Sequence, residues 1–356
     1  MRKRFAPALI FLMFVLLVGQ VLLSPPPCAS AGSPAPAGTG FELTTQSVLR
    51  ADLGAGRITL VRPLPSSGRK IVQTDRHVLI QQADTIQIFD TETLTAHHSV
   101  RLPGEISDIA TSGSLLYAAE GRRIHVFCVL PDGEAAPLRS IVLPKQIDLL
   151  AASGRLLYAL DAVVEPLYAH VIDVNRPGPL RVETATWDSL EAGLVAQAVA
   201  DRWYVMITDV RYGLYLAVLP ARPPLGEVTE RNMLPSNMLP IVEAGGTQGR
   251  IVSGEFAHEF QVYDGIFYGL DGFTNVRLFQ RPAITPQTGI TEVADLGHVS
   301  QHDRRGIIEL EGSTLYVAGD TALYGFELRK GSRPVAMLRI ETGAPIVSFA
   351  AGVHAP

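Results

Sequence analysis

A β-strand unit that recurs along most of the chain restricts the fold more than any other feature of the sequence. Each copy begins with a short run of large hydrophobic residues that often ends in Tyr. These runs are Val78–Ile80, Leu115–Tyr117, Leu156–Tyr158, Trp203–Val205, Ile266–Tyr268 and Thr314–Tyr316. A second apolar strand follows each run, and these second strands begin at residues 86, 124, 169, 215, 276 and 323. Most starts are 38 to 47 residues apart, which is typical of propeller blades.

A third strand with alternating apolar residues follows several copies, for example at His98–Leu102 and Arg139–Leu143. Alternation with a period of two between Gly and Pro turns indicates strands, and helical periodicity is almost absent. We therefore predict an all-β domain over residues 41–356 that forms a β-propeller of six or seven blades, with seven favoured. A tandem β-sandwich is the alternative. The chain end, Pro345–Ala350, is expected to pair with the first blade and close the ring.

One pair of second strands is 61 residues apart, which predicts an insertion between residues 219 and 265. Propellers often place binding loops in such insertions. The segment Glu255–Glu259 is therefore expected to lie in an exposed polar loop.

The first forty residues read as an export signal followed by a tether. A basic start, Met1–Arg4, precedes an apolar run at residues 5–23, and Ala29-Ser30-Ala31 has the small-residue pattern of a cleavage site. Cleavage would fall after Ala31 and remove residues 1–31. The apolar run is long enough to span a bilayer, so an uncleaved signal anchor is the alternative. Residues 32–40 are Gly, Ser, Pro, Ala and Thr and predict a flexible tether.

Either outcome places the domain outside the cytoplasm, as a secreted or periplasmic protein or on the outer face of the cytoplasmic membrane. Membrane anchoring would use residues 5–23. Lipidation at Cys28 is disfavoured, because Pro25, Pro26 and Pro27 stand where lipoprotein signals have small and aliphatic residues.

Cysteine count and charge exclude several classes of function. The two cysteines, Cys28 and Cys128, form no C-x-x-C pair, so neither a zinc knuckle nor a dithiol redox motif is present. Two cysteines also exclude a disulfide framework, and Cys128 is expected to be a buried, inert thiol at the strand end where other copies carry Asp90 and Asp173. The formal net charge is −5 without a basic stripe, which disfavours nucleic acid as a partner.

The third copy of the repeat carries a family resemblance. Leu156–Asp161 followed by Ala169–Leu180, with the sequence AHVIDVNRPGPL, resembles the LVIVD-type repeat of bacterial and archaeal cell-surface proteins. The resemblance is close in this copy alone, and covers residues 78–340 in outline. It implies an extracytoplasmic propeller without an established reaction, and it assigns a role to no residue.

The sequence contains no catalytic or calcium-binding motif: G-x-S-x-G, H-E-x-x-H, P-loop and EF-hand patterns are all absent. Two segments carry candidate metal ligands, His298, His302 and Asp303 in one, and His258 and Glu259 in the other. On a strand His298 and His302 would be about 13 Å apart, too far for one ion, so both segments are interpreted as polar loops. Neither a metal nor a cofactor is predicted, and metal should not be required for stability.

These observations favour a binding scaffold in the cell envelope that presents loops to a protein or glycan partner. The alternative is a propeller enzyme, such as a lactonase-like hydrolase or a quinoprotein, with ligands from several blades at the mouth of the central channel. A purely structural envelope component is a third interpretation, since fold alone does not separate these functions.

Overall fold

The computed structural model describes residue 28 and residues 38–154, 156–161, 167–174, 182–187, 194–199, 202–209, 213–220, 238–240, 257–263, 266–271, 275–282, 291–298, 308–319, 321–330 and 332–351. These residues form strands, turns and short connections without any helix. Among them there is no helix long and apolar enough to cross a membrane. The predicted apolar run at residues 5–23, the cleavage site at 29–31 and most of the tether lie outside the described residues.

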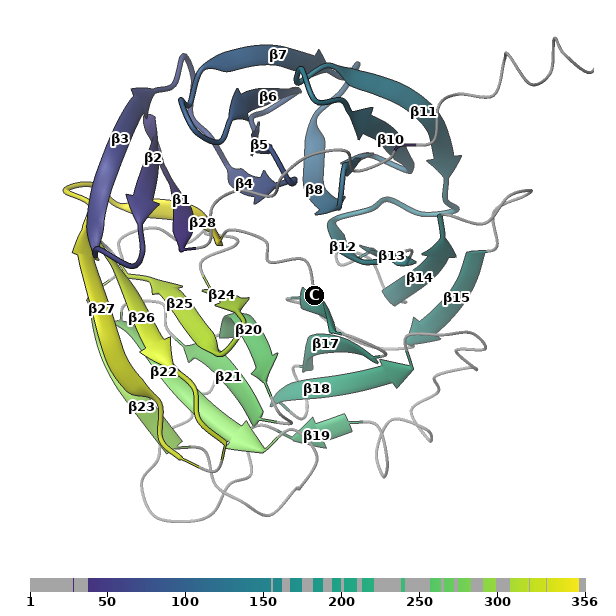
Figure 1. Cartoon of the computed structure of the whole chain (residues 1–356). Coiled ribbons are helices and arrows are strands. Elements are labelled where there is room, and N and C mark those ends of the chain that lie inside the picture. The colour runs from purple at the N-terminus through teal and green to yellow at the C-terminus, as the bar shows by residue number, and fades with distance from the viewer. Residues whose placement is uncertain are drawn as a thin grey trace, which may run out of the picture.

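Seven four-stranded sheets, which we name A to G in chain order, are arranged in a ring (Figure 1). All strand pairs in them are antiparallel, and each sheet is given below from its innermost to its outermost strand. Sheet A contains β28 (Ile346–Ala351), β1 (Thr39–Thr44), β2 (Ser47–Asp52) and β3 (Arg57–Pro63). Sheet B contains β4 (Lys70–Gln73), β5 (His77–Gln81), β6 (Thr85–Asp90) and β7 (Ala96–Arg101). Sheet C contains β8 (Ile106–Ser112), β9 (Leu115–Glu120), β10 (Arg123–Val129) and β11 (Ala135–Val142).

The remaining four sheets repeat this order around the ring. Sheet D contains β12 (Leu149–Ser153), β13 (Leu156–Asp161), β14 (Leu167–Asp173) and β15 (Val182–Trp187). Sheet E contains β16 (Leu194–Val199), β17 (Arg202–Asp209), β18 (Gly213–Pro220) and β19 (Met238–Pro240). Sheet F contains β20 (Ala257–Tyr263), β21 (Ile266–Asp271), β22 (Asn275–Pro282) and β23 (Thr291–His298). Sheet G contains β24 (Ile308–Glu311), β25 (Thr314–Ala318), β26 (Ala322–Glu327) and β27 (Val335–Glu341).

The fold is a β-propeller, which confirms the predicted fold class and leaves no place for the sandwich alternative. The ring is closed by β28, which pairs with β1 over Gly40–Thr44, as the sequence predicted for the chain end. Sheet A therefore joins the two ends of the domain. Its strand β1 begins at Thr39, so Thr39 and Gly40 belong to a buried strand and not to the predicted tether.

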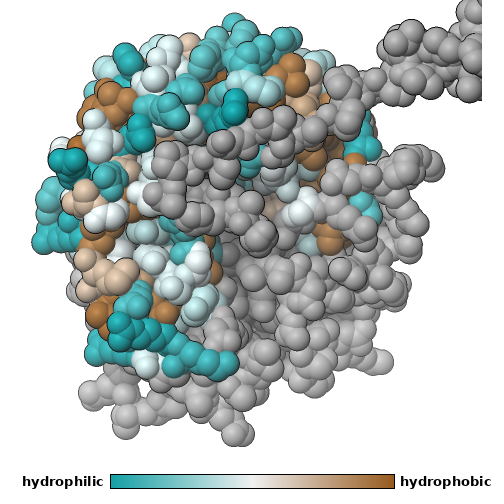
Figure 2. Space-filling model, viewed as in Figure 1, coloured by the Kyte–Doolittle hydropathy of each residue, from teal (hydrophilic) through white to brown (hydrophobic). Residues whose placement is uncertain are grey.

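The hydrophobic core lies between neighbouring sheets and not inside any one of them. Phe41 and Leu43 of sheet A pack with Val78 and Ile80 of sheet B. Equivalent clusters join sheets B and C, C and D, and G and A. A sheet has two faces that each need a partner, and stacking sheets in a ring supplies both. Accordingly, the described residues on the face seen in Figure 2 show hydrophobic side chains only in small areas among hydrophilic ones.

Candidate functional site

The inner strands meet at one end of the ring through a buried ion pair. Lys70 begins β4, and its Nζ lies 2.8 Å from Oδ1 of Asp108 on β8 of the next sheet. The other carboxylate oxygen of Asp108 accepts a hydrogen bond of 2.8 Å from the backbone N–H of Leu150 on β12. The Asp108 side chain is 1% exposed. One carboxylate therefore bonds to both neighbouring sheets.

Other polar groups, most of them on the innermost strands, form the same kind of link between sheets. The links are Ile71 N to Ser348 Oγ at 3.2 Å, Gln81 Nε2 to Ile106 O at 2.8 Å, Ser107 Oγ to Ile147 O at 2.5 Å, and Gln261 Nε2 to Ile308 O at 2.9 Å. Buried polar groups lower the stability of a fold unless they are hydrogen-bonded. Among the described residues, these groups therefore brace adjacent sheets.

The ion pair supports a prediction about stability. Asp108→Ala should lower the free energy of unfolding by about 3 kcal/mol, because it leaves Lys70 without its buried partner. Glu105→Ala is the matched control, since Glu105 pairs with Arg69 at the surface, where an ion pair contributes less than about 1 kcal/mol. Urea unfolding of both variants measures the difference. Equal losses in the two variants would contradict a bracing role for Asp108.

A shallow hollow lies at the same end of sheet C, toward its outer edge. Its volume is about 380 Å³, and Glu120, Arg122, Arg123 and Val142 line it. Glu120 is directly opposite Arg123 across β9 and β10, and Arg123 is directly opposite Val142 across β10 and β11. Residues directly opposite each other point to the same face of a sheet. The three side chains thus form one row, and Val142 is 62% exposed at its end.

Contacts beneath the hollow hold this row in place. Oε2 of Glu120 lies 2.7 Å from Nε2 of His125, and the His125 ring stacks on Phe127. Arg122 donates from Nε to the carbonyl oxygen of Leu143 at 3.1 Å. A Cβ atom at Gly104, in the connection from sheet B, would lie only 2.7 Å from Oε1 of Glu120. The site therefore combines an exposed apolar side chain with positioned charges, a composition found in protein interfaces.

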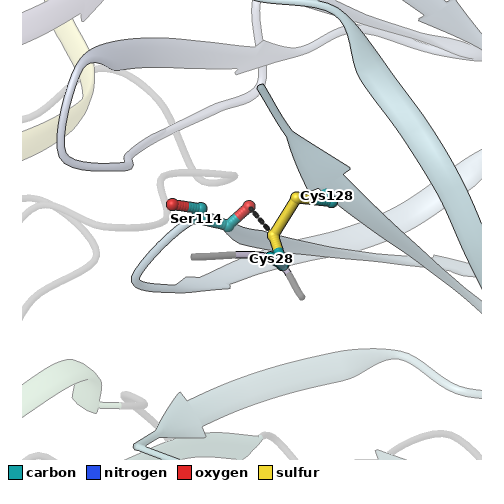
Figure 3. Close-up of a disulfide and its surroundings, with 3 residues drawn as sticks. All are labelled: Cys28, Ser114 and Cys128. Atoms are coloured by element: carbon teal, nitrogen blue, oxygen red, sulfur yellow. Dashed lines mark hydrogen bonds between the residues drawn. A yellow bond between two sulfur atoms is a disulfide. The ribbon is translucent and has the colours of Figure 1, made fainter. Parts of the chain in front are cut away.

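At the opposite end of sheet C the structure forms a disulfide between Cys28 and Cys128 (Figure 3). The Cα atoms are 5.8 Å apart, within the usual range for disulfides. The prediction that Cys128 is a buried, inert thiol was therefore wrong, because its sulfur is bonded to Cys28. Asp90 occupies the equivalent strand end in sheet B, where it accepts hydrogen bonds from Glu92 N and Thr93 N. The same strand-end position thus stabilises a turn by hydrogen bonds in sheet B and forms a disulfide in sheet C.

The candidate metal ligands are separated by the fold. His258 and Glu259 belong to β20, the innermost strand of sheet F, so the prediction that they lie in an exposed loop was wrong. His298 ends β23, the outermost strand of that sheet. Three strand spacings separate these strands, which is about 14 Å and too far for one ion. His302 and Asp303 lie outside the described residues. Among the residues that the structure describes, no group of three His, Cys, Asp or Glu side chains is placed to hold a metal ion.

A pair of histidines lies between sheets B and C at the disulfide end. The rings of His77 and His97 are 6.0 Å apart and perpendicular, and His77 is 3% exposed. Burial, together with the neighbouring His97, lowers the pKa of His77. His97 and His98 are exposed on β7. The pair packs against Gly133, whose Cβ position would lie 2.8 Å from His97.

Comparisons with known proteins identify the fold and nothing finer. No protein-family model matches the chain, and no curated protein does. Among solved structures, a putative 6-phosphogluconolactonase from Bacteroides fragilis is 14% identical, with 89% of this chain and 99% of that chain covered and a TM-score of 0.56. A protein from Lactobacillus plantarum is 14% identical, with 87% and 98% covered and a TM-score of 0.54. The hydrazine synthase of Kuenenia stuttgartiensis is 10% identical, with 77% and 86% covered and a TM-score of 0.54. At such low identity these likenesses establish a β-propeller and carry no activity to this chain.

Proposed function

We propose that this β-propeller is an extracytoplasmic scaffold in the cell envelope that binds a protein partner at the hollow in sheet C. The observation that carries the proposal is the arrangement of polar groups at this end of the ring. Asp108, Ser107 and Gln81 bond to neighbouring sheets, whereas Val142 and the arginines beside it are exposed. A rigid ring that exposes apolar and charged side chains side by side is suited to binding.

Two observations support the location. Disulfides persist in oxidising compartments outside the cytoplasm, and Cys128 forms one with Cys28. The likeness of the third copy to LVIVD-type repeats supports the same location. We further propose that residues 5–23 anchor the chain, because cleavage after Ala31 would separate Cys28 from the domain's main chain.

Arginine together with an exposed aliphatic side chain favours a protein partner over a glycan. Arginine is enriched at protein interfaces, where it pairs with carboxylates of the partner. Arg122 and Arg123 lie beside Val142 in the hollow, so a partner segment with an acidic residue next to an apolar one would fit. Glu120 is held by His125 and gives the row a negative end.

A negative charge introduced into the hollow tests whether the partner binds there. Val142→Asp should reduce chemical crosslinking to the partner in intact cells at least about tenfold, the size expected for a central interface residue. Val61→Asp is the matched control, because Val61 is 52% exposed on the outermost strand of sheet A. Mass spectrometry of the crosslinked species measures both variants. Identical crosslinks in Val142→Asp and the wild-type protein would contradict the proposal.

A further inference from the structure

The disulfide fixes where the N-terminal segment meets the ring. Cys128 lies near the end of β10 and is 5% exposed. Sγ of Cys28 lies 3.8 Å from the carbonyl oxygen of Ser114, and that oxygen also accepts a hydrogen bond of 2.9 Å from Val129 N. Cys28 is thus bonded to the end of β10 and contacts the β8–β9 turn at Ser114 (Figure 3).

The β8–β9 turn and the β10–β11 turn, which follows β10, lie at this end of sheet C, which we call the disulfide face. Because the strands are antiparallel, the β9–β10 turn at Gly121 and Arg122 lies at the other end, beside the hollow. The seven residues of β10 separate the two ends by about 20 Å. Cys28 and the hollow are therefore on opposite faces of the ring.

The covalent link also limits how far the ring can move from a membrane. Four residues, Ser24 to Pro27, separate the apolar run from Cys28. Five chain steps extend at most roughly 18 Å in any conformation. Without the disulfide, the chain from Leu23 to the start of β1 at Thr39 has sixteen steps and a reach of roughly 55 Å, enough for either face to approach the bilayer.

We propose that the disulfide face of the propeller rests against the outer surface of the cytoplasmic membrane, which turns the hollow toward the envelope. The lipid surface is a contact separate from the partner site, and this inference rests on the anchoring in the proposed function. It requires Cys28 to remain in the mature chain. A thioether-linked lipid on Cys28 is incompatible with it, because the sulfur is already bonded to Cys128.

Site-specific photo-crosslinking to lipid tests the orientation in membranes of cells that export the full chain. The photoreactive amino acid replaces Asp132 on the disulfide face or Arg122 on the opposite face, both of which are exposed. We expect crosslinks to phospholipid at least about fivefold more abundant at position 132 than at 122, since the reach limit holds position 132 near the bilayer. In the Cys28→Ser background this preference should fall toward equality. Equal labelling in the wild-type background, or stronger labelling at position 122, would overturn the orientation.

Intact mass and non-reducing peptide mapping of the mature protein provide the second measurement. A peptide that joins Cys28 to Cys128, with a chain that still contains residues 5–23, supports the proposal. A chain that begins at Gly32, or an acyl group on Cys28, overturns it. The partner crosslink that disappears in Val142→Asp is scored separately, so failure of the orientation leaves the partner site standing. Failure of export itself, scored by protease accessibility of the domain in spheroplasts, overturns both.

Discussion

Reduction of the Cys28–Cys128 disulfide should lower the free energy of unfolding by about 4 kcal/mol. The bond closes a loop with a sequence separation of 100 residues. In the unfolded chain the open loop regains the conformational freedom that the bond removes, and this gain grows with loop length. The loop contains β1 to β3 of sheet A, all of sheet B, and β8, β9 and β10 of sheet C up to Cys128, so the bond joins the segment before β1 to the third sheet.

Urea unfolding with and without a reductant measures this loss of stability. Three variants show whether the loss comes from the disulfide. Cys28→Ser, Cys128→Ser and the double variant should each lose the same stability under oxidising conditions, because any one substitution removes the whole bond. None of them should respond to the reductant. A wild-type protein whose unfolding midpoint does not change on reduction would contradict the prediction.

Glu42 should make the protein less stable as the pH rises from about 4.5 to about 8. The residue is 0% exposed on β1. It lies directly opposite Phe349 on β28 and Leu49 on β2. Neither of its carboxylate oxygens has a hydrogen-bond partner in the structure. Burial of this group raises its pKa from 4.5 to about 8, because an apolar environment disfavours the charged form.

The direction of this pH dependence follows from the number of protons that the folded and unfolded states bind. Between pH 4.5 and 8 the folded protein holds a proton on Glu42 that the unfolded chain has released. The folded state binds more protons, so its stability falls with increasing pH. Each pH unit corresponds to about 1.4 kcal/mol, so the total loss is on the order of 4 kcal/mol. His170 opposes this trend at lower pH, since burial lowers its pKa to about 4. The effect of Glu42 is therefore clearest above pH 6.5.

Glu42→Gln removes the titrating group and should flatten the dependence of stability on pH above 6.5. Glu341→Gln is the control, because Glu341 is 61% exposed beside Arg339 and its charge is solvated. Chemical unfolding of the three proteins at pH 6.5, 7.25 and 8 compares the slopes. A slope that is the same in Glu42→Gln and the wild-type protein would show that Glu42 is ionised in the folded state.

The strand repeat was readable from sequence because middle strands such as β9 and β10 are largely buried. Leu115–Tyr117 and Ile124–Cys128, for instance, are almost continuously apolar in β9 and β10. Several of the innermost strands were missed, although the chain end that forms β28 was predicted. Strands such as Lys70–Gln73 and Ile308–Glu311 are only four residues long and carry charged side chains. The charge of Lys70 is compatible with its position because Asp108 on the neighbouring sheet is its partner, which a local pattern does not reveal.

Sequence alone was sufficient to predict the all-β class, the propeller architecture and the pairing of the chain end with the first sheet. Those properties depend on apolar periodicity, which is local and repeated. Tertiary structure decided the disulfide, the bracing role of Asp108, the burial of Glu42 and the row from Glu120 to Val142. It also placed Glu259 and His298 on opposite edges of one sheet. Each of these depends on which strands lie side by side, and closing a ring brings together residues as far apart as Ile71 and Ser348.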